Sequence, residues 1–549
     1  MSLKFIALSG TTDVTENFYL YEYANDIIIV DCGVGFPETE MYGVDLVIPD
    51  FSYVIENKSK LRGVIISHGH EDHLGALPFF LKEVNTQVYA TKLVAGFIED
   101  KLAEHKIKNQ KVNVFDPGKD EIKLGSFKIT PFRVSHSVPD GVGLAIDTPE
   151  GQIFHVPDYK FDWTPVDKKP FDVKKASILA SKGVIMLASD CLGATTPGYT
   201  ESEGHIEERI EEIARKGDKA IFFTTISSNI SRIQQALNVA ERLGRKVSFV
   251  GRSIEVKAEI AKNLGYLHYS QNLVVPMKEL TRLPKNKTWY VISGSYGQGG
   301  SALYRAAHAE HDFLSIEKGD VVIFSSDPAP PGSKVNVDSL VDSLIETGAE
   351  VHYYDMQEDL HVSGHGSQED IKMLFGLAKP KYFVPIGGTI RHMRAYRDIA
   401  VKMGASEQEV FELKAGEIVE FKNGSAHKAG KIDVRDVLVD GLGIGDVGNV
   451  VLRDRQRLAQ DGIAIVLMQL DKKAGMLMSS PEIISRGFVF EKKEKGFLQT
   501  AGSLLMGELR KKKRVDIRVV RNTSIDFLEK YFYKETGRRP MVLPLVVEI

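Results

Sequence analysis

The alternation of apolar and polar positions divides the chain into regions of different type. In the first 200 residues, short apolar runs are separated by turn residues. This pattern predicts strands at 25–33, 61–70, 125–136 and 183–190. From about residue 206 to 355, helical spacing alternates with buried apolar runs, which is typical of a parallel sheet covered by helices. We therefore expect a mostly β region followed by an α/β domain.

The last part of the chain changes character again. The polar stretch FKNGSAHKAGK at 421–431 predicts a linker, and the last hundred or so residues then resume with β and α patterns of their own. The run IAIVLMQL at 463–470 predicts a buried strand. No apolar stretch approaches the roughly 18 to 20 residues that a membrane-spanning helix needs. We expect no membrane segment.

Composition narrows the function classes. A chain of 549 residues has room for several cores of about 150 residues each, which excludes a lone binding module. Lys and Arg number 70 against 74 Asp and Glu, so the net charge of −4 provides no global field that would gather nucleic acid. Any nucleic-acid partner must therefore be bound by local patches. The basic run at 510–514 is one candidate, although such a run also suits a solvated helix end.

The number of cysteines limits the kinds of metal site that the chain can form, and the amino-terminal segment indicates its cellular compartment. Cys32 and Cys191 are the only cysteines, too few for a disulfide framework or a cysteine-based zinc site. Any metal must be held by histidine and carboxylate. The amino-terminal segment MSLKFIALSG lacks a secretory apolar region, and we expect a cytoplasmic protein.

The strongest chemical signal is the segment SHGHEDHLGALPFF at 67–80. It places His68, His70, Asp72 and His73 within six residues, directly after an apolar strand. Alternate residues of an extended or tightly turned loop point the same way, so His68 and His70 can hold one ion while the other two turn toward a second. A histidine-rich surface loop is the alternative interpretation.

Two later residues supply the remaining ligand types. His136 ends a predicted strand, and Asp158 offers two oxygens that can bridge adjacent ions. Each could also be structural when taken alone. Asp31, at the end of the run IIIVD, is either an acceptor that orients a ligand histidine or a turn residue before Gly33.

Several motifs, taken in order, resemble one protein family. The HxHxDH run at 68–73, with Asp31 before it and His136 and Asp158 after it, resembles the metallo-β-lactamase fold. Three further segments narrow the resemblance to ribonuclease J, of the β-CASP branch: 223–253, 361–370 and 439–463. The resemblance covers nearly the whole chain.

The resemblance implies an α/β protein with three parts. These are a metallo-β-lactamase αββα sandwich, an inserted α/β β-CASP domain, and a small α+β C-terminal domain that supports dimerisation. The expected bounds are 1–205 and 356–425 for the sandwich, 206–355 for the insertion, 426–445 for a linker and 446–549 for the C-terminal domain.

The resemblance also implies a set of site residues. It places His68, His70 and His136 at one metal, Asp72 and His73 at the other, and Asp158 between them. Catalytic roles are implied for Asp72 and for Asp190, the latter paired with His361 as proton donor or phosphate partner. Ser363, His365 and Gly366 match a loop that resembles a phosphate-holding pocket, where hydroxyl, imidazole and backbone N–H groups suit an anionic oxygen. The alternative is an ordinary turn with a buried histidine pair.

One departure from the family pattern concerns the metals. The family has a further ligand histidine in PIHGEYRH, whereas this chain reads PIGGTIRH at 385–392, so Gly387 replaces the imidazole and Thr389 replaces an acidic residue. His392, slightly later, is a possible substitute. Pro157 before Asp158, and GSYGQGGSAL at 294–303, are lesser departures. We expect one tightly held ion and a second only at higher metal concentration. The imidazole-rich ligand set favours zinc, with manganese or magnesium as alternatives.

The expected function is metal-dependent cleavage of single-stranded RNA. The resemblance implies 5′-to-3′ exonuclease and endonuclease activity in RNA processing and decay, including rRNA processing, and a homodimer or homotetramer. Basic residues proposed to face an RNA groove are Arg232, Arg252 and Arg391, each of which could instead form a surface salt bridge. A catalytically impaired RNA-binding paralogue is one alternative, motivated by Gly387. A small-molecule hydrolase acting on a thioester or lactone is another, although it would need no inserted domain.

Overall fold

The computed structural model of the chain describes all residues except 39, 327–332, 355–359, 442, 489–490 and 513. The described residues form two compact units, which are treated separately. The first unit contains residues 1–36 and 46–437, and the second contains 37–45 and 438–549. Every described helix is too short or too polar to cross a lipid bilayer.

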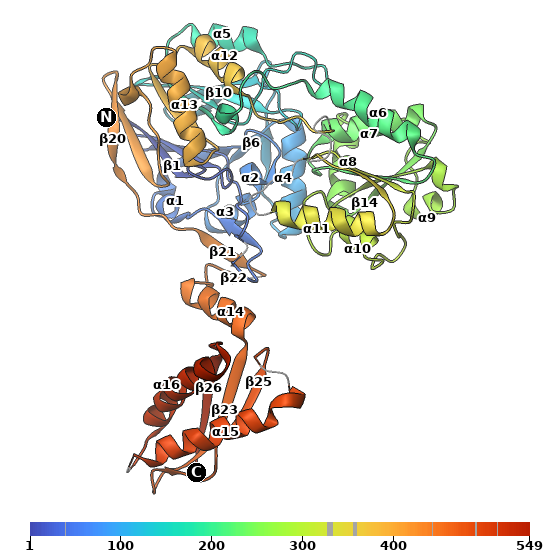
Figure 1. Ribbon diagram of the computed structural model, residues 1–549. Coiled ribbons are helices and arrows are strands. Elements are labelled where there is room, and N and C mark those ends of the chain that lie inside the picture. Colours follow the sequence, from blue (N-terminus) through green and yellow to red (C-terminus); the bar gives the residue numbers. More distant parts are fainter. Residues whose placement is uncertain (39, 327–332, 355–359, 442, 489–490, 513) are drawn as a thin grey trace. The chain divides into compact units, whose positions relative to one another are not determined.

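Two sheets form the centre of the first unit (Figure 1). Among the described residues, the larger has eight strands in the order β20-β19-β1-β2-β3-β5-β6-β7. Its strands are β1 (Leu3–Ser9), β2 (Phe18–Tyr23), β3 (Asp26–Val30), β5 (Leu61–Ile65), β6 (Val88–Ala90), β7 (Val112–Val114), β19 (Glu417–Lys422) and β20 (Ser425–Lys431). The order of the second sheet is β18-β12-β11-β10-β9-β8. Its strands are β8 (Ile122–Leu124), β9 (Phe127–Arg133), β10 (Val142–Thr148), β11 (Gly151–Val156), β12 (Val184–Asp190) and β18 (Tyr382–Ile386).

Apolar side chains from both sheets share one core, to which Phe5, Ile28 and Leu144 belong. A second core lies between the other face of the smaller sheet and the helices α5 (Val173–Ala180), α12 (Gln368–Ala378) and α13 (Ile390–Lys402). The larger sheet is covered by its own helices: α1 (Ser52–Glu56), α2 (Glu71–Leu74), α3 (Leu77–Glu83) and α4 (Lys92–Glu104). This layering confirms the expected αββα sandwich, and burial of both sheet faces explains the nearly continuous apolar strands.

The chain leaves the sandwich after β12 and returns to it with α12 and β18. These two strands pair in parallel, with Met186 opposite Tyr382, although almost two hundred residues separate them in the sequence. The intervening chain builds a parallel sheet in the order β14-β15-β13-β16-β17. Its strands are β13 (Ile221–Thr224), β14 (Lys246–Val250), β15 (Thr288–Ile292), β16 (Val321–Phe324) and β17 (Glu350–His352). The insertion is therefore an α/β domain, as expected.

Helices flank the inserted sheet. They are α6 (Ile206–Lys216), α7 (Ile230–Arg242), α8 (Arg252–Leu264), α9 (Met277–Leu280), α10 (Ala302–Ala307) and α11 (Ser333–Glu346). Side chains of α10 and α11, such as Leu303 and Leu340, pack with Phe222 and Ile292 of the sheet in one core. Asn229 begins α7 by accepting a hydrogen bond from the Arg232 N–H, which matches the preference of asparagine for helix starts.

The expectation of a linker at 421–431 is wrong. Residues Ser425–Lys431 form strand β20, which pairs antiparallel with β19 at the edge of the larger sheet. The turn between the strands contains Asn423 and Gly424, both at positive φ. The polarity of the stretch reflects an exposed edge strand, because the side chains of such a strand face water.

The second unit contains its own sheet and core. Strand β23 (Ile463–Asp471) pairs with β24 (Met476–Leu477), β25 (Glu482–Arg486) and β26 (Met541–Glu548). Helices α15 (Glu491–Arg510) and α16 (Ile517–Thr536) contribute to the apolar core. The unit also contains α14 (Asn449–Asp461) and the short hairpin of β21 (Val437–Asp440) and β22 (Gly443–Ile444). The strand expected at 463–470 is confirmed, but only alternate residues of it are buried.

Candidate metal centre

The loop from 66 to 70 joins strand β5 to helix α2 and carries the first histidines. Asp31, in the left-handed region with φ of 64°, follows strand β3 and fixes this loop. One of its carboxylate oxygens accepts from the Ser67 N–H at 2.7 Å, and the other accepts from the Ser67 hydroxyl and from His73 Nδ1, both at 2.8 Å. Asp31 therefore combines the two roles considered for it, since it occupies the turn and orients a histidine.

Close backbone packing holds the next turn of the site. A Cβ atom on Gly33 would lie 1.6 Å from the backbone oxygen of Asp72, so no side chain fits there. The backbone N–H of Cys32 donates to the His73 oxygen at 2.8 Å, and that of Asn17 donates to the Asp72 oxygen at 3.0 Å. The start of α2, which carries Asp72 and His73, is thus fixed by two separate segments, residues 31–33 and Asn17.

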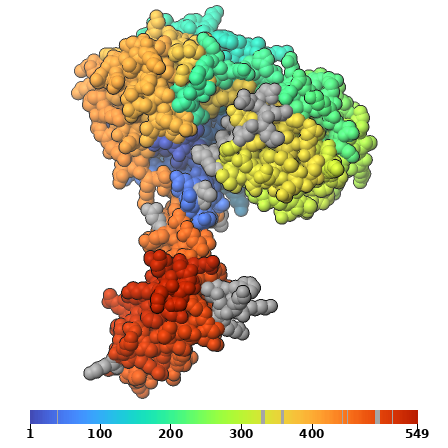
Figure 2. Space-filling model, in the orientation of Figure 1, coloured from blue at the N-terminus to red at the C-terminus, as the bar shows by residue number. Residues whose placement is uncertain are grey.

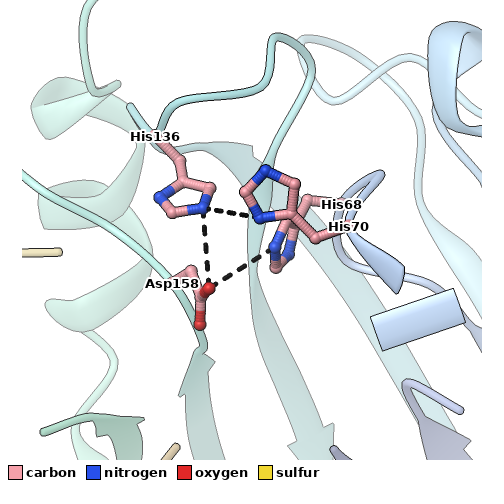
Figure 3. Close-up of side chains that lie close together, drawn as sticks. All are labelled: His68, His70, His136 and Asp158. Atoms are coloured by element: carbon pink, nitrogen blue, oxygen red, sulfur yellow. Dashed lines mark hydrogen bonds and ion pairs between the residues drawn. The ribbon is translucent and has the colours of Figure 1, made fainter. Parts of the chain in front are cut away.

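The first candidate group consists of His68, His70, His136 and Asp158, with one ligand atom of each within 4.8 Å of the others (Figure 3). Asp158 Oδ2 lies 3.5 Å from Nε2 of both His68 and His136. His136 Nε2 lies 3.1 Å from His70 Nδ1. The three rings and the carboxylate point toward a common centre, although His136 and Asp158 come from segments far from 68–70 in the sequence.

Hydrogen bonds determine which ring nitrogens face this centre. The Ser67 hydroxyl donates to Asp31, so its oxygen can only accept from His68 Nδ1, at 3.0 Å. His136 Nδ1 donates to the Gly364 carbonyl at 2.8 Å. The Nε2 atoms of both rings therefore carry lone pairs directed to the centre, which is the arrangement that a metal ligand needs.

The first group fits a divalent cation. His68 Nε2 is buried and has no hydrogen-bond partner among the described residues, an arrangement that costs free energy unless an ion satisfies the atom. Burial and the neighbouring His68 lower the pKa of His70 to about 3, and burial also lowers the pKa of His136. The imidazoles of His70 and His136 are therefore neutral, as ligands must be.

The second candidate group is Asp72, His73 and Asp158. His73 Nε2 lies 3.4 Å from Asp72 Oδ2 and 3.4 Å from Asp158 Oδ1. Asp158 thus directs one oxygen to each group, as a bridging carboxylate would. Although burial opposes it, the carboxylates of Asp158, Asp72 and Asp31 raise the pKa of His73, so this location favours positive charge.

Sequence reasoning missed Asn17, whose amide lies in the second group. Its Nδ2 is 3.0 Å from His73 Nε2 and 3.1 Å from the backbone oxygen of Asp72, and its Oδ1 accepts from the Tyr19 hydroxyl at 2.7 Å. Asn17 belongs to the sequence ENFYL, which carries no ligand spacing. Only the fold brings it to this site.

Gly387 borders the second group and leaves space there. A Cβ atom on it would meet only Asp190 Oδ1 at 3.8 Å and Asn17 Oδ1 at 4.0 Å, which are ordinary contacts. His392 does not replace the missing imidazole, because its Nδ1 accepts from the Thr389 N–H at 3.2 Å at the start of α13. The second group therefore has fewer ligands than the first.

The expected pairing of Asp190 with His361 is wrong. Asp190 Oδ2 accepts from His365 Nδ1 at 2.7 Å, and the other ring nitrogen of His365 lies 3.9 Å from Asp158. His361 instead contacts the Tyr354 ring edge-on, with 6.0 Å between ring centroids. The two histidines lie four residues apart in one loop, so sequence alone did not distinguish them. The loop backbone does so, by carrying His365 toward the end of β12.

The expected phosphate-holding loop is only partly available to an anion. The Ser363 side chain is exposed, and its Oγ accepts from the His365 N–H at 3.1 Å. The backbone N–H of Gly366 already donates to the backbone oxygen of Tyr159 at 2.6 Å. The expectation that this N–H contacts an anion is therefore wrong. His365 and the Ser363 hydroxyl remain as polar groups that can face a ligand.

The three arginines expected at a groove differ in their surroundings. Arg232 is fully buried and forms an ion pair with Glu203, so the expectation that it faces RNA is wrong. Arg252 is exposed and lies 3.0 Å from Glu104, and Arg391 Nε donates to His392 at 3.4 Å. Neither of these last two contacts excludes a role at a phosphate.

Comparison with family models covers most of the chain. Residues 27–174 match the beta-lactamase superfamily domain, and 218–344 match the ribonuclease J beta-CASP domain. Residues 354–411 match the Zn-dependent metallo-hydrolase RNA specificity domain, and 450–549 match the ribonuclease J C-terminal domain.

Full-length relatives agree with these matches. Ribonuclease J2 of Bacillus subtilis is 35% identical over 100% of this chain and 99% of its own. Ribonuclease J 1 of Streptococcus pyogenes is 35% identical over 98% of this chain and 97% of its own. A crystal structure of a protein of unknown function from Enterococcus faecalis has 16% identity, a TM-score of 0.53, and covers 76% of this chain and 100% of that one. This last likeness concerns the fold alone.

The geometry predicts unequal metal binding by the two groups. After extensive dialysis, we expect elemental analysis to find about one divalent ion per chain, because only the first group offers three imidazoles and a carboxylate. Gly387→His should raise the retained number toward two and tighten the second site at least about tenfold, since space for the side chain exists.

The matched control is Gly387→Ala. Gly387 has φ of 64°, so both variants adopt a strained backbone that costs about 1–2 kcal/mol, but only histidine adds a ligand. Two ions retained by the unmodified chain, or equal retention by both variants, would contradict the assignment.

Proposed function

Because this chain belongs to the ribonuclease J family, we propose that it is a metal-dependent hydrolase that cleaves phosphodiester bonds of single-stranded RNA. The observation that carries the proposal is the convergence of His68, His70, His136 and Asp158 on one centre, where the buried Nε2 of His68 has no hydrogen-bond partner among the described residues. The family resemblance extends the proposal to 5′-to-3′ exonuclease or endonuclease cleavage in RNA processing and decay. The imidazole-rich first group favours zinc, whereas the carboxylates of the second also suit manganese.

The shape of the first unit supports a polymeric substrate. A small pocket lies where the sandwich meets the inserted domain, and its lining includes His136, Glu203 and Ser231. Figure 2 shows amino-terminal residues, in blue, at the bottom of a hollow beside the yellow and green inserted domain. A single unpaired strand suits a narrow groove better than a duplex does.

The candidate metal groups and His365 have different roles in the proposed reaction. When bound, a divalent ion lowers the pKa of a coordinated water from about 15.7 toward roughly 7 and neutralises charge on phosphoryl oxygens. His68, His70, His136 and Asp158 would hold that ion through their convergent atoms. His365, oriented by Asp190, then donates its Nε2 proton to the leaving 3′ oxygen.

The charge state of His365 suits a proton donor. Despite burial, Asp190 and Asp158 raise its pKa to about 10, so the ring carries its proton at neutral pH. The sequence predicts this role for His361, but His365 is the histidine that contacts Asp190, so we propose His365 as the proton donor.

The first prediction concerns activity itself. The chain should cleave 5′-monophosphorylated single-stranded RNA, and a chelator or His70→Ala should reduce cleavage to background, because both remove the ion of the first group. Exposed His427 of β20 provides the control, since His427→Ala should leave the rate unchanged. Absence of cleavage by the unmodified chain at any divalent ion would favour an impaired, RNA-binding paralogue. Hydrolysis of small esters or lactones, without RNA cleavage, would favour a small-molecule hydrolase.

A second prediction separates the two histidines of the loop. His365→Ala should reduce kcat for RNA cleavage by about a hundredfold or more, the usual contribution of a positioned proton donor, while His361→Ala has a smaller effect. Asp190→Asn should lower the pKa of His365, so the alkaline limb of the pH–rate profile moves to lower pH. A larger loss in His361→Ala, with an unchanged profile in Asp190→Asn, would return the donor role to His361.

A third prediction concerns self-association. In the second unit, alternate residues of β26 and β25 leave Leu543, Leu545 and Ile484 about 40% exposed on the sheet face opposite the buried residues. We propose that a second copy of the chain covers this apolar face, giving a homodimer or homotetramer. Sedimentation analysis should find an oligomer that Leu545→Glu dissociates and that Ile178→Glu, at an exposed residue of α5, does not. A monomeric unmodified chain would refute this interface.

A further inference from the structure

A buried charge cluster lies where the chain crosses between the sandwich and the inserted domain. It consists of Lys160, which follows Asp158, Glu203 on the outgoing crossing, and Arg232 of α7. Lys160 and Arg232 are fully buried, and Glu203 is 2% exposed. We infer that these three residues position the returning loop 360–366 against the metal ligands, and thereby set the geometry of the RNA-cleaving site. The inference rests on the proposed function for its kinetic consequence only.

Lys160 belongs to the sandwich and contacts both connecting segments: the outgoing one, at Glu201 and Glu203, and the returning loop 360–366. Its Nζ donates to Glu203 Oε1 at 3.2 Å, to the Glu201 carbonyl at 3.1 Å and to the Ser363 carbonyl at 2.9 Å. Its backbone N–H donates to the oxygen of Ser135, the residue before His136, at 2.8 Å. One residue thus connects the outgoing segment and the returning loop through its side chain, and the segment that carries His136 through its backbone.

Arg232 belongs to the inserted domain and contacts the same two connecting segments, at Glu203 and at Leu360. One of its terminal nitrogens pairs with Glu203 Oε2. The other donates to the Leu360 carbonyl at 3.1 Å and to Ser325 Oγ at 2.5 Å. The Ser325 hydroxyl in turn donates to the Leu360 carbonyl at 2.8 Å. The beginning of the loop is therefore anchored to the inserted domain, while Lys160 anchors its middle to the sandwich.

The charges of the cluster make these carbonyl contacts necessary. Two cations share one carboxylate, and their attraction lowers the pKa of Glu203 to about 2 although burial opposes ionisation. Both cations also donate to backbone oxygens, Lys160 to those of Glu201 and Ser363 and Arg232 to that of Leu360. These contacts matter because a buried charge without hydrogen bonds is strongly unfavourable. If the loop moved away, Lys160 would lose the Ser363 oxygen and Arg232 the Leu360 oxygen. The cluster therefore favours one loop position.

The position of the loop controls the reacting groups. The carbonyl of Gly364 accepts from His136 Nδ1, and a Cβ atom on Gly364 would lie 2.5 Å from the His136 ring. The residue after Gly364, His365, forms an ion pair with Asp190. A shift of about 1 Å would disturb a metal ligand and the proton donor together, and such misplacement can cost about a hundredfold in rate. Lys160, Glu203 and Arg232 are positioning residues rather than catalytic ones.

The test compares Lys160→Met with Arg242→Met. Both remove a cation, but Arg242 forms its ion pairs on the surface between α7 and α6, away from the loop. In Lys160→Met we expect kcat for RNA cleavage to fall about tenfold to a hundredfold, with the RNA dissociation constant changed less than about threefold and the metal content unchanged. Lys160→Arg should restore part of the rate, and Arg242→Met should retain it.

Amide hydrogen exchange provides a readout that needs no activity. In Lys160→Met, the N–H groups of His365 and Gly366 should exchange at least about tenfold faster, because their loop loses its anchor, whereas Arg242→Met should leave them unchanged. Ser325→Ala, a milder change at the Leu360 anchor, replaces Lys160→Met if that variant does not fold. Unchanged exchange and unchanged kcat in a variant that is only less heat-stable would overturn the inference. If the unmodified chain cleaves no RNA, the proposed function fails, and exchange still decides the inference.

Discussion

The buried carboxylate of Asp158 is the contact on which the candidate site depends. Four histidines, 68, 73, 136 and 365, lie within 3.9 Å of its two oxygens. A carboxylate removed from water requires positive charge or hydrogen bonds around it, and neutral imidazoles supply these only when an ion or a proton lies between them. His73, acting against the cost of burial, keeps the pKa of Asp158 well below its usual range. The surrounding structure serves to hold these rings at one point.

The sandwich provides the rigid part of this arrangement. The candidate ligands follow the ends of β5 in the larger sheet and of β9 and β11 in the smaller one, and Asp190 ends β12, so the packing of the two sheets brings four distant segments together. The supporting hydrogen bonds of Asp31 and Ser67 then select the ring nitrogen that faces the centre. A metal site built in this way can be precise, because the ligand orientation is determined by packed backbone rather than by exposed loops.

The loop that returns from the inserted domain adds His365 to the site. The chain leaves the sandwich after β12 and returns beside that strand at β18, so the returning loop with His365 must lie next to Asp190. The parallel pairing of these strands thus explains why a segment almost two hundred residues away completes the site. The buried cluster at the crossings gives the same loop a single position. The unequal metal groups follow from the same segment, because Gly387 directly follows β18.

The sequence alone determined the residue types and most of the elements. Histidine spacing at 68–73 and the apolar runs along the chain are local properties, and so the metal chemistry, the β-rich first region and the α/β insertion were predictable. The αββα layering was implied only by the resemblance of the motifs to the metallo-β-lactamase fold. The polar stretch at 421–431 misled, because an exposed edge strand and a linker have the same composition. Tertiary structure alone decided which of two histidines meets Asp190, that Asn17 joins the second metal group, and that Arg232 is buried rather than exposed. The physical reason is that these contacts depend on strand pairing and chain crossings between segments tens to hundreds of residues apart, where spacing along the sequence carries no information about distance in space.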